Sequence, residues 1–232
     1  MKNIINLLKY NFGRYHTGTS KILYIIGFSV LFINTFSILT RIPIISEIIA
    51  LSNIALICTF LGLNFIGSII RFVRQISKEK GKLLFTFPFK SYEFVIAKIL
   101  EFTIIQGGIV LVGYIMSILS VDSISDLIKI SSFSVAYGTI ISYIITISLI
   151  TIVLSYIKNV ALSMVVVVIG GSILTGIFDK IIYSITNIFP YLYIKIGNFM
   201  EIDIIYFLLT LGSISFLVYL AIYHLEKKLD II

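Results

Sequence analysis

Residues 159–178 read NVALSMVVVVIGGSILTGIF, a stretch with no charged residue and no histidine. A helix rises about 1.5 Å per residue, so twenty residues cover about 30 Å, the thickness of the hydrocarbon layer of a bilayer. The stretch does not alternate apolar and polar residues, as a strand of a membrane barrel would. It therefore predicts a helix that crosses a membrane.

Five further runs have the same charge-free, apolar character: 22–40, 48–70, 102–121, 133–156 and 204–223. Over the 232 residues, hydrophobic side chains make up 59% and charged ones 12%, against about 45–50% and 25% in soluble domains. This composition excludes a soluble enzyme and a disordered linker, and the single cysteine, Cys58, excludes a disulfide-rich scaffold. We expect an all-α integral membrane protein with six transmembrane helices in one domain, residues 1–232.

The basic residues predict the orientation. With the N-terminus inside, the inner segments are 1–21, 71–101, 157–158 and 224–232, and they hold 14 of the 18 Lys and Arg residues. Positive charge accumulates on the cytoplasmic side of short membrane loops. We therefore expect a multi-pass protein of the cytoplasmic membrane with both termini in the cytoplasm.

Residues 179–203 on the outer side are unusually apolar, but Pro190 and Lys195 interrupt them. A seventh span would place the C-terminal lysines outside, so we reject it. The segment predicts a re-entrant or interfacial helical pair, and an ordinary wet loop is the alternative. Its aromatic residues would lie at headgroup depth: Tyr183, Phe189, Tyr191, Tyr193 and Phe199.

The first 20 residues predict a helix that lies on the cytoplasmic leaflet. On a helical wheel, one side carries Ile4, Ile5, Leu7, Leu8, Phe12 and Tyr15. The other side carries Asn6, Lys9, Gly13 and His16. The alternative is a basic flank that only sets the topology.

The largest cytoplasmic segment, 71–101, is rich in basic residues and also carries apolar ones: Leu83, Leu84, Phe85, Phe87 and Phe89. Pro88 stops helix propagation, and Ser91 with Glu93 is typical of the start of the next helix. Large apolar side chains on a cytosolic loop usually indicate an interface. Folding back onto the membrane is the alternative.

The order Glu79, Gly81, Leu84, Pro88, Ser91 and Lys98, after the second of six spans, resembles the permeases of type-two ATP-binding-cassette (ABC) transporters, in the compact peptide or drug exporter branch. The resemblance implies a cytoplasmic coupling helix between spans two and three that docks into an ATPase subunit. The residues it implies for this coupling site are Lys78, Glu79, Lys80, Gly81, Lys82, Leu83, Leu84, Phe85 and Pro88.

The chain has no phosphate-binding motif G-x-x-x-x-G-K-[ST], so we expect no cofactor in this chain, with ATP and Mg bound by a separate ATPase subunit. The resemblance implies a second permease copy or a sister permease as a further partner, within the lipid bilayer. No feature points to nucleic acid. The spans contain Ser and Thr but no His or acid to activate them, so an enzyme is not expected, and no metal site is expected.

These expectations combine into an ATP-driven exporter of an amphipathic or hydrophobic cargo, such as an antimicrobial peptide, a peptide toxin or a drug. The possible cargo path would take its few polar contacts from Asn34, Asn53, Asn64 and Gln106. A stand-alone membrane immunity or sensor protein is the main alternative. A secondary transporter is less favoured, because its proton relay would need acids or histidines at membrane depth.

Overall fold

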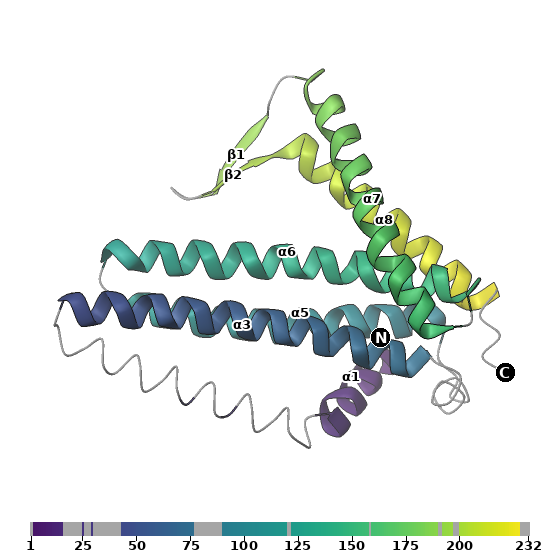
Figure 1. Cartoon of the computed structure of the whole chain (residues 1–232), viewed down its shortest axis with the longest axis horizontal. Coiled ribbons are helices and arrows are strands. Elements are labelled where there is room, and N and C mark those ends of the chain that lie inside the picture. Colours follow the sequence, from purple (N-terminus) through teal and green to yellow (C-terminus); the bar gives the residue numbers. More distant parts are fainter. Residues whose placement is uncertain are drawn as a thin grey trace. The chain divides into compact units, whose positions relative to one another are not determined.

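The computed structural model describes residues 2–15, 25, 29, 43–76, 90–119, 122–157, 159–189, 192–196 and 200–227. These residues form six helices and two short strands (Figure 1). The helices are α1 (Lys2–Tyr15), α3 (Pro43–Ile76), α5 (Ser91–Leu119), α6 (Asp122–Leu154), α7 (Val160–Thr186) and α8 (Ile204–Lys227). The strands are β1 (Tyr193–Ile196) and β2 (Met200–Asp203).

Five of the described helices are long and apolar enough to cross a membrane, which makes this a membrane-embedded protein. Their membrane-compatible parts are Leu51–Ile76, Ser91–Ile115, Ser134–Leu154, Val160–Thr186 and Ile204–Lys227. They correspond to five of the six predicted spans. The remaining predicted span, 22–40, lies outside the described residues except for Ile25 and Ser29.

The helices extend beyond the charge-free runs. α3 continues to Ile76, and α5 begins at Ser91 with Glu93 in its first turn, as the capping pattern predicts. Both ends of the segment predicted as a coupling loop, 71–101, are therefore helical. Charged residues end an apolar run without ending a helix, and the helix start predicted at Ser91 within this segment is confirmed.

The chain divides into two compact units. Unit 1 comprises Met1–Ile70 and Tyr92–Ile140, and unit 2 comprises Arg71–Ser91 and Ile141–Ile232. The apolar core of unit 1 centres on Ile57, Leu61, Ile109 and Ala136, which come from α3, α5 and α6. These helices therefore pack together within unit 1.

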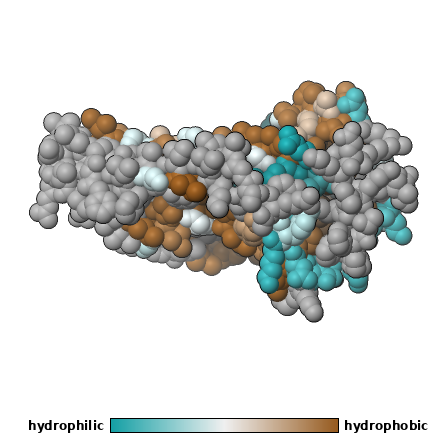
Figure 2. Space-filling model, turned by 90° about the horizontal axis from the view of Figure 1, so that it is seen from below, coloured by the Kyte–Doolittle hydropathy of each residue, from teal (hydrophilic) through white to brown (hydrophobic). Residues whose placement is uncertain are grey.

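The buried face of α3 in unit 1 is partly polar, whereas its exposed face is apolar. Asn53, Asn64 and Ser68 are buried at helical spacing, while Leu63 and Ile66 are 53% and 56% exposed. In Figure 2, hydrophobic atoms form several patches on the described part of the surface, and hydrophilic atoms gather toward one end. This distribution suits a protein surrounded by lipid. Lipid accommodates apolar side chains but offers no hydrogen-bond partners, so polar side chains form their hydrogen bonds inside the protein.

In unit 2, Asn159 caps α7: its Oδ1 accepts hydrogen bonds from the backbone N–H groups of Ala161 (3.0 Å) and Leu162 (3.3 Å). α7 also approaches α6 closely, because a Cβ added at Gly171 would lie 3.3 Å from Leu149 Cδ1. α8 returns along α7 in the opposite direction (Figure 1).

The predicted helical pair at 179–203 is corrected by the structure. α7 continues through Asp179 and Lys180 to Thr186, and β1 and β2 then form an antiparallel hairpin. The physical reason is local. The stretches YIKI and MEID alternate apolar and other residues with a period of two, which favours strands over helices.

Candidate functional site

A hydrogen-bonded network joins three helices in the interior of unit 1. Asn64 Nδ2, on α3, donates to Gln106 Oε1, on α5, at 3.3 Å. Gln106 Nε2 donates to Thr139 Oγ1, on α6, at 2.8 Å and to the Leu61 carbonyl at 3.4 Å. Ser68 Oγ donates to Asn64 Oδ1 at 3.4 Å. One side chain, Gln106, thus connects all three helices.

Gln106 is fully buried, with 0% exposure, and both protons of its amide have acceptors. Thr139 extends the network by one more hydrogen bond, because its hydroxyl donates to the Ala136 carbonyl at 2.9 Å. A hydrogen bond between membrane helices contributes on average about 0.6 kcal/mol and up to about 1.7. The network contains no titratable group, and its direct effect is to hold α3, α5 and α6 together.

The network contains two of the four residues predicted for the cargo path. Asn64 and Gln106 contact each other inside unit 1, and a cargo could reach them only if the three helices separated. Asn53 lies on the same buried face of α3, eleven residues before Asn64, and has 0% exposure. Asn34 lies outside the described residues.

A second polar contact joins α1 to the first turn of α5. Asn3 Nδ2 lies 3.2 Å from Glu93 Oε1 and 3.1 Å from Oε2. The face of α1 that unit 1 buries carries Leu7 (3% exposed) and Asn11 (1%), one and two turns beyond Asn3. Ile5 stays 52% exposed. The predicted N-terminal helix is confirmed over Lys2–Tyr15, its position on the cytoplasmic leaflet stays a prediction, and Ile5 on its apolar side remains uncovered.

α5 also carries a buried ion pair. Lys98 Nζ lies 2.7 Å from Glu101 Oε2, and the two side chains are 3% and 7% exposed. With Glu93, the first three turns of this membrane-compatible helix hold three buried charged residues. Charges at such positions are costly unless paired and commonly mark functional regions of membrane proteins. They lie in the last part of the predicted coupling loop, 71–101, after the predicted coupling residues 78–88.

In unit 2, His224 of α8 contacts the end of α6. Its Nδ1 lies 3.2 Å from Ser155 Oγ, which itself donates to the Ile152 carbonyl at 2.6 Å. Which of these two atoms donates the proton depends on the tautomer of His224. In either tautomer the contact links α8 to the end of α6.

Aromatic rings hold the His224 imidazole in place. The ring centroids of Tyr156 and Tyr223 lie 5.4 and 5.7 Å from that of His224. No sequence pattern indicates this cluster, because Ser155 and His224 are 69 residues apart.

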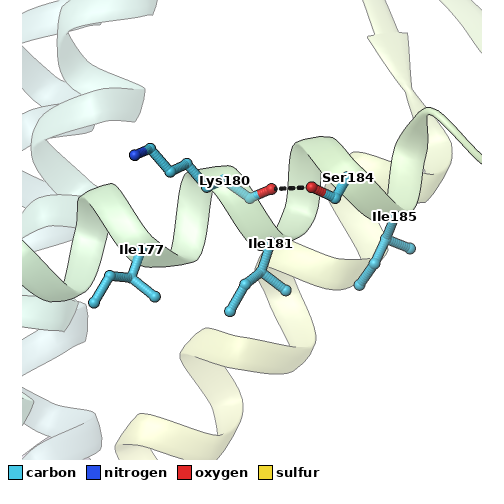
Figure 3. Close-up of a pocket in the computed structure, with 5 residues that line it drawn as sticks. All are labelled: Ile177, Lys180, Ile181, Ser184 and Ile185. Carbon is cyan, nitrogen blue, oxygen red and sulfur yellow. Dashed lines mark hydrogen bonds between the residues drawn. The ribbon is translucent and has the colours of Figure 1, made fainter.

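A shallow groove of about 320 Å³ runs along α7 (Figure 3). Its lining residues are Ile177, Lys180, Ile181, Ser184 and Ile185. The three isoleucines point to one side of the helix. The Ser184 hydroxyl donates a hydrogen bond to the Lys180 carbonyl at 2.8 Å. Isoleucines one helical turn apart, on the exposed side of a membrane-compatible helix, account for this groove without a ligand.

The predicted coupling residues, from Lys78 to Phe85 together with Pro88, lie outside the described residues. Within the part that the structure describes, no three His, Cys, Asp or Glu side chains lie close enough together to hold a metal ion. No protein-family profile, curated protein or solved structure matches the chain.

Sequence reasoning missed the pairs Asn3–Glu93 and Lys98–Glu101. The pair Lys98–Glu101 could have been predicted, because opposite charges three residues apart on a helix lie on one face. The first joins residues 90 positions apart, and no sequence pattern indicates it.

Proposed function

We propose that this chain is the membrane-spanning subunit of an ATP-driven exporter in the cytoplasmic membrane. A separate ATPase subunit, which binds ATP and Mg, would dock at residues 78–88, and a second permease copy or a sister would complete the transporter. The observation that carries this proposal is the bond between Asn3 and Glu93. It couples the N-terminal helix to the helix that directly follows the docking segment.

The force of the ATPase would reach the membrane through α3 and α5. The docking segment connects Ile76, the last residue of α3, to the start of α5. Gln106 binds both helices to α6, so a displacement at the docking segment would move the three helices as a group. α1 would follow through Asn3.

The cargo proposed here is an amphipathic or hydrophobic peptide or drug. The apolar parts of the membrane-compatible helices carry uncharged side chains on their exposed faces, which suits a cargo with little charge. Amide side chains such as Asn53 would supply polar contacts when the helices rearrange during transport.

The test is co-purification of an ATPase with the tagged full-length protein in mild detergent. We expect the ATPase to appear in roughly equal amount with the wild type. Glu79→Ala should reduce it, and the double variant Leu83→Asp/Leu84→Asp should abolish it, because charge at an apolar contact is costly.

Glu226→Ala is the matched control, since it removes an exposed glutamate elsewhere and should retain the ATPase. Each variant must elute as a single species in size-exclusion chromatography. If no ATPase accompanies even the wild type, under conditions that preserve other transporter complexes, the stand-alone membrane protein becomes the better reading.

A further inference from the structure

The hairpin of β1 and β2 has two chemically different faces. Tyr193 pairs with Asp203, Ile194 with Ile202, Lys195 with Glu201 and Ile196 with Met200. Paired residues of an antiparallel ladder share a face, and neighbours along a strand alternate. One face therefore holds Ile194, Ile196, Met200 and Ile202. The other holds Tyr193, Lys195, Glu201 and Asp203.

A two-stranded hairpin of this size is marginal in water, and it needs a surface for its apolar face. Its base is fixed by the Ile204 N–H, which donates to the Leu192 carbonyl at 3.0 Å. Asp203 then starts α8, since its Oδ1 accepts from the N–H groups of Ile205 (2.9 Å) and Tyr206 (3.4 Å). The hairpin is thus tied directly to a helix that is apolar enough to cross the membrane.

The charged residues place the hairpin at the edge of the hydrocarbon layer. In α7 the charge-free part from Val160 to Phe178 is about 28 Å long, and Asp179 follows it. In α8 the charge-free part begins directly after Asp203. A four-residue strand reaches about 13 Å, so the hairpin lies within that distance of the boundary at Asp203.

We propose that this hairpin is a membrane-surface anchor. Its Ile194, Ile196, Met200 and Ile202 face rests on the acyl chains, and its Tyr193, Lys195, Glu201 and Asp203 face meets the headgroups and water. The occupant of the apolar face is bilayer lipid, because β2 leads directly into α8, a membrane-compatible helix.

Residues flanking the hairpin support lipid as the occupant. Ile188, Phe189 and Leu192 are 78%, 51% and 54% exposed between α7 and β1. Tyr193 is 53% exposed, at a position on the polar face. Tyrosine beside a boundary charge is typical of the aromatic belt at a membrane surface. This inference does not rest on the proposed exporter function.

The experiment is spin labelling of the full-length protein in liposomes. Single cysteines are introduced into a Cys58→Ser background as Ile194→Cys, Ile202→Cys, Tyr193→Cys and Glu201→Cys. Collision rates with oxygen, which concentrates in lipid, and with a water-soluble nickel chelate are measured by electron paramagnetic resonance. We expect high oxygen and low nickel access at 194 and 202, and the reverse at 193 and 201.

Val168→Cys, on the exposed surface of α7, provides the lipid reference, and Lys90→Cys provides the water reference. Size-exclusion chromatography checks that each variant is folded. Equal nickel access on both faces would overturn the proposal, because the hairpin would then stand in water. Spin–spin broadening at 194 and 202 that disappears on dilution with unlabelled protein would overturn it too, in favour of a second copy on this face.

Discussion

Gln106 illustrates how a single buried amide can determine packing in a lipid surround. Apolar side chains gain little by leaving lipid for a protein interior, so hydrogen bonds and close fit contribute more to the association of membrane helices. Gln106 meets this need with both amide protons and its carbonyl oxygen. The contributions of Asn64 and Thr139 to helix packing therefore depend on their hydrogen bonds to Gln106.

Replacing Gln106 with Leu should lower stability by about 0.5–2 kcal/mol, because Asn64 and Thr139 each lose a partner. Thermal unfolding in detergent measures the loss. Adding Asn64→Leu should cost less than the sum of the two single changes, since the shared bond is already gone. Strictly additive losses would show that the two amides act independently.

His224 combines a hydrogen bond with two ring contacts, and two substitutions separate these contributions. His224→Phe keeps an aromatic ring and should lower the melting temperature slightly. His224→Ala also leaves a gap between two tyrosines, so its loss should be larger, on the order of 1–3 kcal/mol. Equal losses in thermal unfolding would mean that the Ser155 bond carries the whole effect.

At the scale of elements, α1 contacts α5 through Asn3 and Glu93, and its stripe of Leu7 and Asn11 is buried in unit 1. Asn3→Ala removes the Glu93 contact and should speed amide hydrogen exchange in α1 roughly tenfold, which corresponds to about 1.4 kcal/mol. Asn6→Ala changes an exposed asparagine of the same helix and should leave exchange unchanged. Equal protection in both variants would mean that the stripe alone holds α1.

The packing of α7 on α6 depends on a close approach at Gly171. Gly171→Leu should destabilise unit 2 by about 1–3 kcal/mol, because its Cβ would already lie 3.3 Å from Leu149 Cδ1. Gly170→Leu is the matched control, since a Cβ there meets nothing within 4 Å. Comparison of the two melting temperatures tests the contact, and a similar loss in both variants would argue against it.

Elements differ in how well the sequence predicted them. Runs without charge, such as 159–178, identified five helices because length and hydropathy alone decide whether a helix can cross a bilayer. The hairpin was missed, because apolar and aromatic composition at a membrane surface suits a helix and a strand equally. Only the two-residue period of YIKI and MEID separates them. Pairs such as Ser155 and His224 depend on tertiary packing, which composition does not encode.

At the scale of the whole molecule, alternating crossings of the five membrane-compatible helices predict which residues share a side of the membrane. Lys90, before α5, and Lys227, at the end of α8, should lie together, with Lys180 on the opposite side. In intact cells, a membrane-impermeant maleimide should label Lys180→Cys and leave Lys90→Cys and Lys227→Cys unlabelled in the Cys58→Ser background. Labelling of all three would contradict the crossing order, and the reverse pattern would contradict the predicted orientation.

The bond between Asn3 and Glu93 also bears on the parity of the crossings. It holds α1 beside the start of α5. α3 runs antiparallel to α5, so its first residue, Pro43, lies near the opposite end of α5. The sequence predicts that the apolar run 22–40 crosses the membrane once between α1 and α3. With the five membrane-compatible helices, the number of predicted crossings is then even. We therefore expect α1 and the end of α8 to lie in the same compartment, where one partner could engage them together.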